Sequence, residues 1–197
     1  LTYRSLRLRK AFSTLTFLPN ICAVISMAII FKLFFDTNVG LLNAILESLG
    51  INRQEWLTGT SLSKVPVIVL YAWRNTPWYT MILISGMLAI PGEHYEAATV
   101  DGANVLQQFF RITLPSLSNI LFFCMISLTS DSWRLFNESY MLKGPGTSNI
   151  SLFQYMYESG FTIFKMGYAS AIGVILTVIL LITSIIQFII RKRQGEV

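Results

Sequence analysis

Four long apolar runs, separated by shorter polar segments, dominate the pattern of hydrophobic and polar positions along the chain. They cover residues 16–35, 66–90, 112–129 and 166–190. A helix needs about 20 mainly apolar residues to cross a bilayer, and each run meets or approaches that length. The pattern therefore predicts an all-α fold, a polytopic transmembrane helical bundle with about four spans.

Composition and charge agree with a membrane protein. Of the 197 residues, 53% are hydrophobic and only 13% are charged, whereas a soluble domain has about 25% charged residues. Two basic clusters adjoin the outermost runs, one in residues 1–15 and one at the chain's end. Their members are Arg4, Arg7, Arg9, Lys10, Arg191, Lys192 and Arg193. Because basic residues mark the cytoplasmic side of a membrane protein, we expect both ends, and the segment 91–111, to be cytoplasmic.

The composition also argues against several functions. The net charge of +5 does not form a basic stripe with interleaved aromatics, so nucleic-acid binding is not expected. Cys22 and Cys124 lie inside apolar runs, as small buried hydrophobic residues do, and His94 is the single histidine. No nucleophile elbow, zinc-protease or Walker A motif occurs. We therefore predict no catalytic residues, no metal site and no cofactor bound by this chain.

The connection between the first two runs has a helical pattern of its own. The sequence "NVGLLNAILESLG" places Leu41, Leu42, Ile45, Leu46 and Leu49 on one helical face, and Gly50 suits a C-terminal cap. This pattern predicts a short helix in the outer membrane interface.

The segment 91–111 is charged and rich in small residues, although apolar runs flank it. Pro91 and Glu93 favour a helix start, and Gly102 can adopt the left-handed conformation that ends or bends a helix. Beyond it, Val105, Phe109 and Ile112 recur near helical spacing, as do Leu106 and Phe110. We expect a slim helix, a bend, and an amphipathic return to the bilayer that closes at Pro115. By shape alone, a simple interfacial connector fits equally well.

The string "YEAATVDGA…FFRITLP" resembles the EAA signature of inner-membrane permeases of ATP-binding-cassette importers. Glu96-Ala97-Ala98 is followed by Gly102 and then, nine residues on, by Ile112-Thr113-Leu114-Pro115. The resemblance covers almost the whole chain, through "LPN", "GLLN…LG…W", "AW…LAIPGEHYEAA", "GPG" and "MGYASAIGVILTVIL". It is closest to the sugar permeases of the maltose type, first subunit.

The resemblance implies a function and a set of partners. The chain is then a permease of the bacterial or archaeal cell membrane. It pairs with a second permease, a dimeric ATPase that holds ATP and Mg²⁺, and an extracytoplasmic binding protein that delivers a sugar. In that family the EAA loop is a coupling helix that docks on the ATPase. The resemblance assigns this coupling to Glu93, Tyr95, Glu96, Ala97, Ala98, Asp101, Gly102 and Ala103.

Polar residues within the spans indicate where a substrate passes, because such groups usually face a protein interior or a wet cavity. Two clusters, "YAWRNTPWYT" and a Ser/Thr-rich run, lie in the outer half of the second and third spans, and Pro77 can kink the former. They supply the candidate pathway residues Arg74, Asn75, Trp78, Ser127, Asp131 and Ser132. Aromatic faces, amides and hydroxyls suit a sugar. Trp73 and Trp78 fit an interfacial aromatic belt equally well, Arg74 a charge paired between helices, and Asp131 the outer surface.

Two departures limit the resemblance. These permeases usually have two further helices before the position where this chain starts, so we expect an N-terminally truncated chain. The outer segments "KGPG" and "SDSWRLFNESY" differ from the family pattern, which leaves a non-sugar solute such as glycerol phosphate as an alternative. An ATPase-independent secondary transporter is less well supported, because the spans carry few ionisable groups and that mechanism gives the EAA string no role.

Overall fold

A computed structural model describes residues 17–193 of the chain. These residues are helical throughout their regular parts, with no strand among them, which confirms the all-α prediction. They form two compact units whose boundaries fall within helices. Unit 1 comprises residues 17–77 and 132–179, and unit 2 comprises residues 78–131 and 180–193. The basic segment at residues 1–15 lies outside the described residues.

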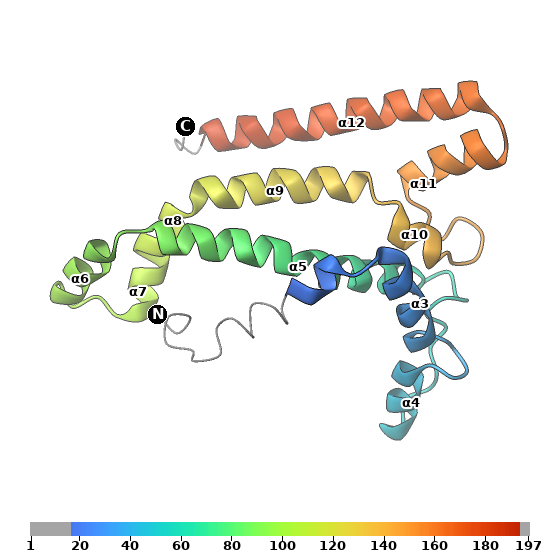
Figure 1. Ribbon diagram of the computed structural model, residues 1–197, viewed down its shortest axis with the longest axis horizontal. Helices are drawn as coiled ribbons and strands as arrows, with labels where there is room; N and C mark the ends of the chain where they lie inside the picture. The colour runs from blue at the N-terminus through green and yellow to red at the C-terminus, as the bar shows by residue number, and fades with distance from the viewer. Residues whose placement is uncertain (1–16, 194–197) are drawn as a thin grey trace. The chain divides into compact units, whose positions relative to one another are not determined.

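The helices follow one another in the order in which Figure 1 colours them. They are α3 (Val24–Phe34), α4 (Leu41–Ser48), α5 (Lys64–Ala89), α6 (Gly92–Val100), α7 (Val105–Gln108), the π-helical turn η1 (Phe109–Thr113), α8 (Leu114–Ser116), α9 (Ser118–Trp133), α10 (Asn137–Met141), α11 (Leu152–Tyr157), the π-helical turn η2 (Glu158–Thr162) and α12 (Met166–Arg193).

The four apolar runs correspond to helices with different boundaries. α5 and α12 nearly coincide with the second and fourth runs. The first run is interrupted at Cys22 and Ala23, so α3 has only 11 residues. The third run crosses a 65° bend, because residues 112–116 belong to the helical stretch before the bend and α9 begins at Ser118.

By length and composition, α12 is the one helix among residues 17–193 that could cross a membrane alone. The bent pair Val105–Ser116 and Ser118–Met141 passes the same test if it counts as one span. Most of the apolar surface of α12 is exposed, as expected for a helix whose solvent is hydrocarbon. The number of four spans stays a prediction.

Unit 1 packs α3, α5 and α10 around a small apolar core. Ala28, Val67, Leu70 and Leu142 are its buried members, and Figure 1 shows α10 beside α3. Trp73 of α5 packs its ring against that of Phe31, with centroids 5.6 Å apart. This core fixes the part of α5 that carries Arg74 and Asn75.

Buried polar side chains hold the loops of unit 1. Asn149 donates to the carbonyls of Ser63 (3.1 Å) and Leu142 (2.7 Å). Ser139 donates to the Asn149 carbonyl at 2.8 Å. Nearby, burial raises the pKa of Glu158, but hydrogen bonds from Lys143 and Gln154 outweigh it and leave the pKa below its usual value. These bonds order the Gly/Pro-rich turn after α10.

The short helix predicted after residue 40 is present as α4, and Gly50 follows it with φ +75°, as its capping role requires. Its location in the outer membrane interface stays a prediction. Leu41, Ile45 and Leu49 form an exposed apolar stripe. On the other face, Asn43 is 1% exposed and makes four hydrogen bonds. Its amide donates to the carbonyls of Thr37 and Gln54 at 3.0 and 2.9 Å, and its oxygen accepts from the Gln54 backbone and the Trp56 indole, both at 3.0 Å.

We expect Asn43→Ala to loosen the segment 36–62 by roughly 2–4 kcal/mol, because it leaves several buried polar groups without partners. Limited trypsin cleavage after Arg53, measured on the purified protein, should become faster. The control is Asn38→Ala, which removes an exposed amide that makes none of these bonds. Equal cleavage rates for the two variants would contradict this role of Asn43.

Candidate functional site

Helix α6 carries Glu96, Ala97 and Ala98, and most of its surface is accessible. None of its nine residues is buried. Pro91 precedes its first residue and Glu93 lies in its first turn, both as predicted. Glu96 and Ala97 are exposed and Ala98 is half-buried. A helix this thin and uncovered can be approached closely by another surface.

Gly102 ends α6 in the left-handed conformation that the sequence predicts, with φ +77°. Its N–H donates to the Thr99 carbonyl at 3.1 Å, and the Ala103 N–H donates to the Ala98 carbonyl at 2.9 Å. This pair of bonds is a Schellman motif, which satisfies the last carbonyls of the helix. A Cβ at Gly102 would meet no atom within 4 Å, so the requirement for glycine is conformational.

The next helix, α7, begins at Val105, and a capping box at Asn104 closes its N-terminus. The Asn104 side chain accepts from the Gln107 backbone, and the Gln107 side chain accepts from the Asn104 backbone, both at 2.9 Å. The joint between α6 and α7 is therefore closed by hydrogen bonds on both sides. An Asn followed three residues later by Gln is a sequence signal that predicts the start of α7.

Side-chain hydrogen bonds also tie α6 to the helical stretch that follows, beside which it lies (Figure 1). The hydroxyls of Tyr95 and Thr113 are 2.8 Å apart. Gln108 donates to the Thr99 hydroxyl at 3.0 Å and to the Ala103 carbonyl at 3.2 Å. Gln108 and Thr113 are 7% and 6% exposed. These bonds orient α6 on a base formed by α7 and η1.

The helical stretch that leads to α9 ends at a different residue than predicted. The helical path does not close at Pro115, because α8 continues through it to Ser116, and the 65° bend follows before Ser118. Proline is tolerated here because it occupies the first turn of α8. Just beyond, Gly86 of α5 allows a close approach, since a Cβ there would lie 2.3 Å from Ile120.

Apolar side chains surround the base of α6 without covering it. Val100, Val105 and Leu106 are 88%, 72% and 68% exposed. Phe109 and Phe110 are also exposed and contact each other edge to face. The candidate site is thus a polar and small-residue helix with an apolar margin, a surface typical of protein–protein contacts.

The six predicted pathway residues divide between the two units. Arg74, Asn75 and Ser132 belong to unit 1, whereas Trp78, Ser127 and Asp131 belong to unit 2. Trp78 is 50% exposed, and Asp131 accepts a hydrogen bond from the Tyr79 hydroxyl at 3.4 Å.

Within unit 1, Arg74 of α5 pairs with Glu138 of α10, which confirms the alternative of a charge paired between helices. The guanidinium lies 3.3 Å from the carboxylate, which is 5% exposed. Asn20 donates to the Arg74 carbonyl at 3.4 Å, and Asn75 donates to the Tyr71 carbonyl at 2.9 Å. No local pattern indicates the Arg74–Glu138 pair, because the two residues are 64 positions apart.

The chain belongs to the family of binding-protein-dependent transport system inner membrane components, whose family model matches residues 2–196. It is 35% identical over 189 residues to a probable ABC transporter permease protein, YurN, of Bacillus subtilis (strain 168), covering 94% of this chain and 65% of the relative. It is 32% identical to the arabinooligosaccharides transport system permease protein AraP of the same strain, covering 95% and 61%. The chain thus spans less than two thirds of the length of these relatives.

A solved structure has the same fold. It is that of a bacterial alginate ABC transporter in complex with an alginate pentasaccharide-bound periplasmic protein. The TM-score is 0.85 at 22% identity, over 98% of this chain and 69% of the other.

Removing the hydroxyl contact between Tyr95 and Thr113 should loosen α6 on its base. Tyr95→Phe and Thr113→Val each remove a hydrogen bond that contributes about 1 kcal/mol to the stability of this attachment. Amide hydrogen exchange in residues 93–100 should therefore become roughly fivefold faster. The double variant should be little worse than either single one, since both remove the same contact. Tyr155→Phe, which removes a hydroxyl contact in unit 1, is the control. Unchanged exchange in all three variants would exclude this contact as an anchor.

Proposed function

We propose that the chain is a permease subunit of an ATP-driven importer for a sugar or oligosaccharide. With a second permease it forms the membrane pathway, and an extracytoplasmic binding protein delivers the substrate. Both chain ends and the segment 91–111 face the cytoplasm, where α6 docks on a separate dimeric ATPase that holds ATP and Mg²⁺. This chain supplies no catalytic group of its own.

The observation that carries the proposal is the state of α6. None of its residues is buried, yet the hydrogen bonds at Gly102 and Asn104 and two side-chain bonds, Tyr95–Thr113 and Gln108–Thr99, fix its orientation. A connector that only reverses the chain needs no such fixation. A helix that transmits a partner's movement does, because rigid-body transfer requires a stiff connection.

Membership in the transport family supports the importer class. A sugar substrate is supported by the relative named for arabinooligosaccharide transport and by the aromatic and amide groups at Trp78 and Asn75. In the alginate transporter with the same fold, the complex includes a periplasmic protein loaded with substrate, which favours the same route of delivery here.

Glu96→Lys and Gly102→Val should leave membrane insertion intact but weaken coupling to the ATPase. The first change replaces a carboxylate by a repulsive charge, which costs about 2–5 kcal/mol at a docked interface. ATPase association should then fall at least ~30-fold. The second strains a left-handed backbone and adds bulk to the docking surface. Co-purification of the ATPase and hydrolysis stimulated by the binding protein are the measurements.

Matched controls separate docking from general damage. Gly50→Val introduces the same strain at another open glycine with φ +75°, and Glu55→Lys reverses an exposed charge in the same outer segment. Both should retain hydrolysis and ATPase binding. A cysteine at Val100, which is 88% exposed, should react from the inner side of the membrane alone. If both α6 variants kept wild-type coupling, the segment 91–111 would only connect two helices.

Substitutions at Asn75 and Trp78 should lower uptake without affecting assembly. Asn75→Leu removes an amide, and Trp78→Ala removes a half-exposed aromatic face, a loss of about 0.5–1.5 kcal/mol. We expect roughly two- to tenfold slower uptake at subsaturating sugar in reconstituted vesicles. Trp73→Ala, which breaks the ring contact with Phe31, should instead lower thermal stability. Normal uptake in both pathway variants would leave these residues with a structural role.

A further inference from the structure

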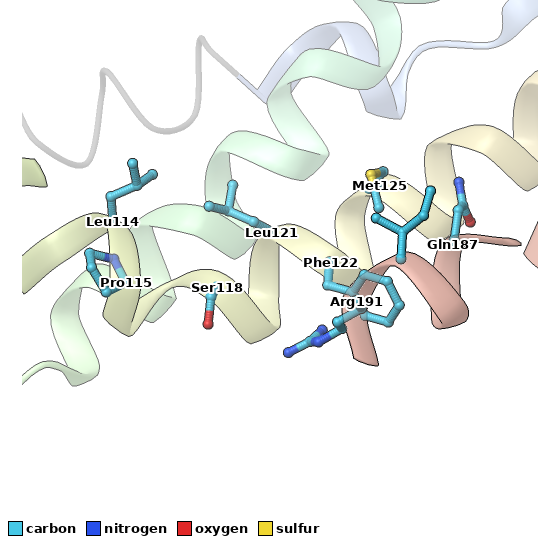
Figure 2. A pocket seen from close by; sticks show the side chains of 9 residues that line it. Leu114, Pro115, Ser118, Leu121, Phe122, Met125, Gln187 and Arg191 are labelled. Atoms are coloured by element: carbon cyan, nitrogen blue, oxygen red, sulfur yellow. The ribbon is translucent and has the colours of Figure 1, made fainter. Parts of the chain in front are cut away.

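A cleft of about 440 Å³ lies within unit 2, between α8, α9 and the last turns of α12. Its walls are mostly apolar, with Leu114, Leu121, Phe122 and Met125 on one side and Ile190 on the other. Figure 2 shows Arg191 extending from α12 into this space towards the end of the cleft that Ser118 lines. None of the cleft residues contributes to the coupling surface on α6.

Arg191 is a buried cation at one end of the cleft. It is 8% exposed, and its guanidinium lies 4.1 Å from the centre of the Phe122 ring. It donates one hydrogen bond, to the Asn119 side chain. No carboxylate lines the cleft, and Arg191 forms no ion pair among residues 17–193. A buried charge is costly unless it is compensated. Arg191 lies in the last turn of α12, whose C-terminal carbonyls supply only a partial negative charge, so a full negative charge beside the guanidinium would be stabilising.

The unused donors of Arg191 point to where an anion binds. A guanidinium has five N–H groups, and one of them serves Asn119. Among residues 17–193, the buried side-chain atoms that lack a hydrogen-bond partner include no nitrogen of Arg191. The N–H groups that do not bond Asn119 are therefore accessible, in the planar arrangement that suits phosphate oxygens.

The position of Arg191 on α12 places it at the depth of lipid headgroups. With 28 residues, the helix is about 42 Å long at 1.5 Å per residue. It therefore extends beyond a hydrocarbon layer of about 30 Å. Phe188, Ile189 and Ile190, just before Arg191, are about half exposed, so apolar surface continues from the cleft along α12.

We propose that this cleft binds an anionic phospholipid, with the headgroup phosphate on Arg191 and part of an acyl chain along the apolar walls. Lys192 and Arg193, both exposed, add positive charge beside the opening, which favours lipids of net negative charge. A small soluble anion would leave the apolar walls uncovered. That the lipid belongs to the cytoplasmic leaflet rests on the proposed orientation.

The test is native mass spectrometry of the assembled transporter, purified with its full chain from membranes containing phosphatidylglycerol and phosphatidylcholine. The wild type should retain phosphatidylglycerol in preference to phosphatidylcholine. Arg191→Gln, which can still bond Asn119, should lower that retention by more than tenfold, as expected for the loss of hydrogen bonds between charged groups in addition to one positive charge. Arg193→Gln makes the same charge change at an exposed position and should lower retention less, by about fivefold, because it removes only positive charge near the lipid surface.

A second variant keeps the test independent of the charge. Leu121→Trp narrows the cleft but leaves Arg191 in place, and it should also reduce retention. Addition of inorganic phosphate or glycerol phosphate should not release the lipid. Equal retention of both lipids, release by free phosphate, or no lipid on the wild type would overturn the proposal. Glu96→Lys should retain lipid while coupling is lost, so a failure of this site and a failure of the proposed function are distinguishable.

Discussion

A chain in hydrocarbon must satisfy its own backbone hydrogen bonds, and most of this structure depends on that constraint. It explains why the described residues are helical and why polar side chains on the long helices bond to their own helix. Each of these side chains donates to the carbonyl four residues earlier: Asn75, Thr76, Ser85, Thr129, Ser170 and Thr177. Polar groups can then occur along the helices without requiring a partner elsewhere.

Side chains that do reach across elements therefore indicate specific placement. Arg74 pairs with Glu138, and Gln187 donates to Thr129 at 2.8 Å. Arg191 is different, because its side-chain partners among residues 17–193 are an amide and an aromatic ring, and the C-terminal turn of α12 gives it only a partial negative charge. The contrast between a cation paired with a carboxylate and one without such a pair in the described part of the chain is what makes the cleft at the end of α12 a candidate ligand site.

The sequence was sufficient to predict features that depend on one residue or on local spacing. The start of α6 at Pro91, the left-handed Gly102 and the outer helix α4 follow from the conformational preferences of proline and glycine and from helical periodicity. The bend before Ser118 was missed, because apolar composition continues through it and does not reveal a change of direction. The sequence offered Arg74 as a charge paired between helices, but it did not indicate the partner Glu138 or the Tyr95–Thr113 contact, because each pair joins positions that only the folded chain brings together.

The way α6 is attached explains how a movement could pass through it. Because no residue of α6 is buried, packing contributes little to its position. Two polar side-chain contacts, each worth about 1 kcal/mol, hold the helix in place. One of them ends on Gln108 and the other on Thr113, both in the helical stretch before the bend that leads to α9. In the proposed coupling, a force on α6 would reach α9 through η1. An open joint at residues 101–104 would flex and absorb that movement. The proposed function therefore requires the closed hydrogen bonding at Gly102 and Asn104 as much as it requires a surface that receives the force.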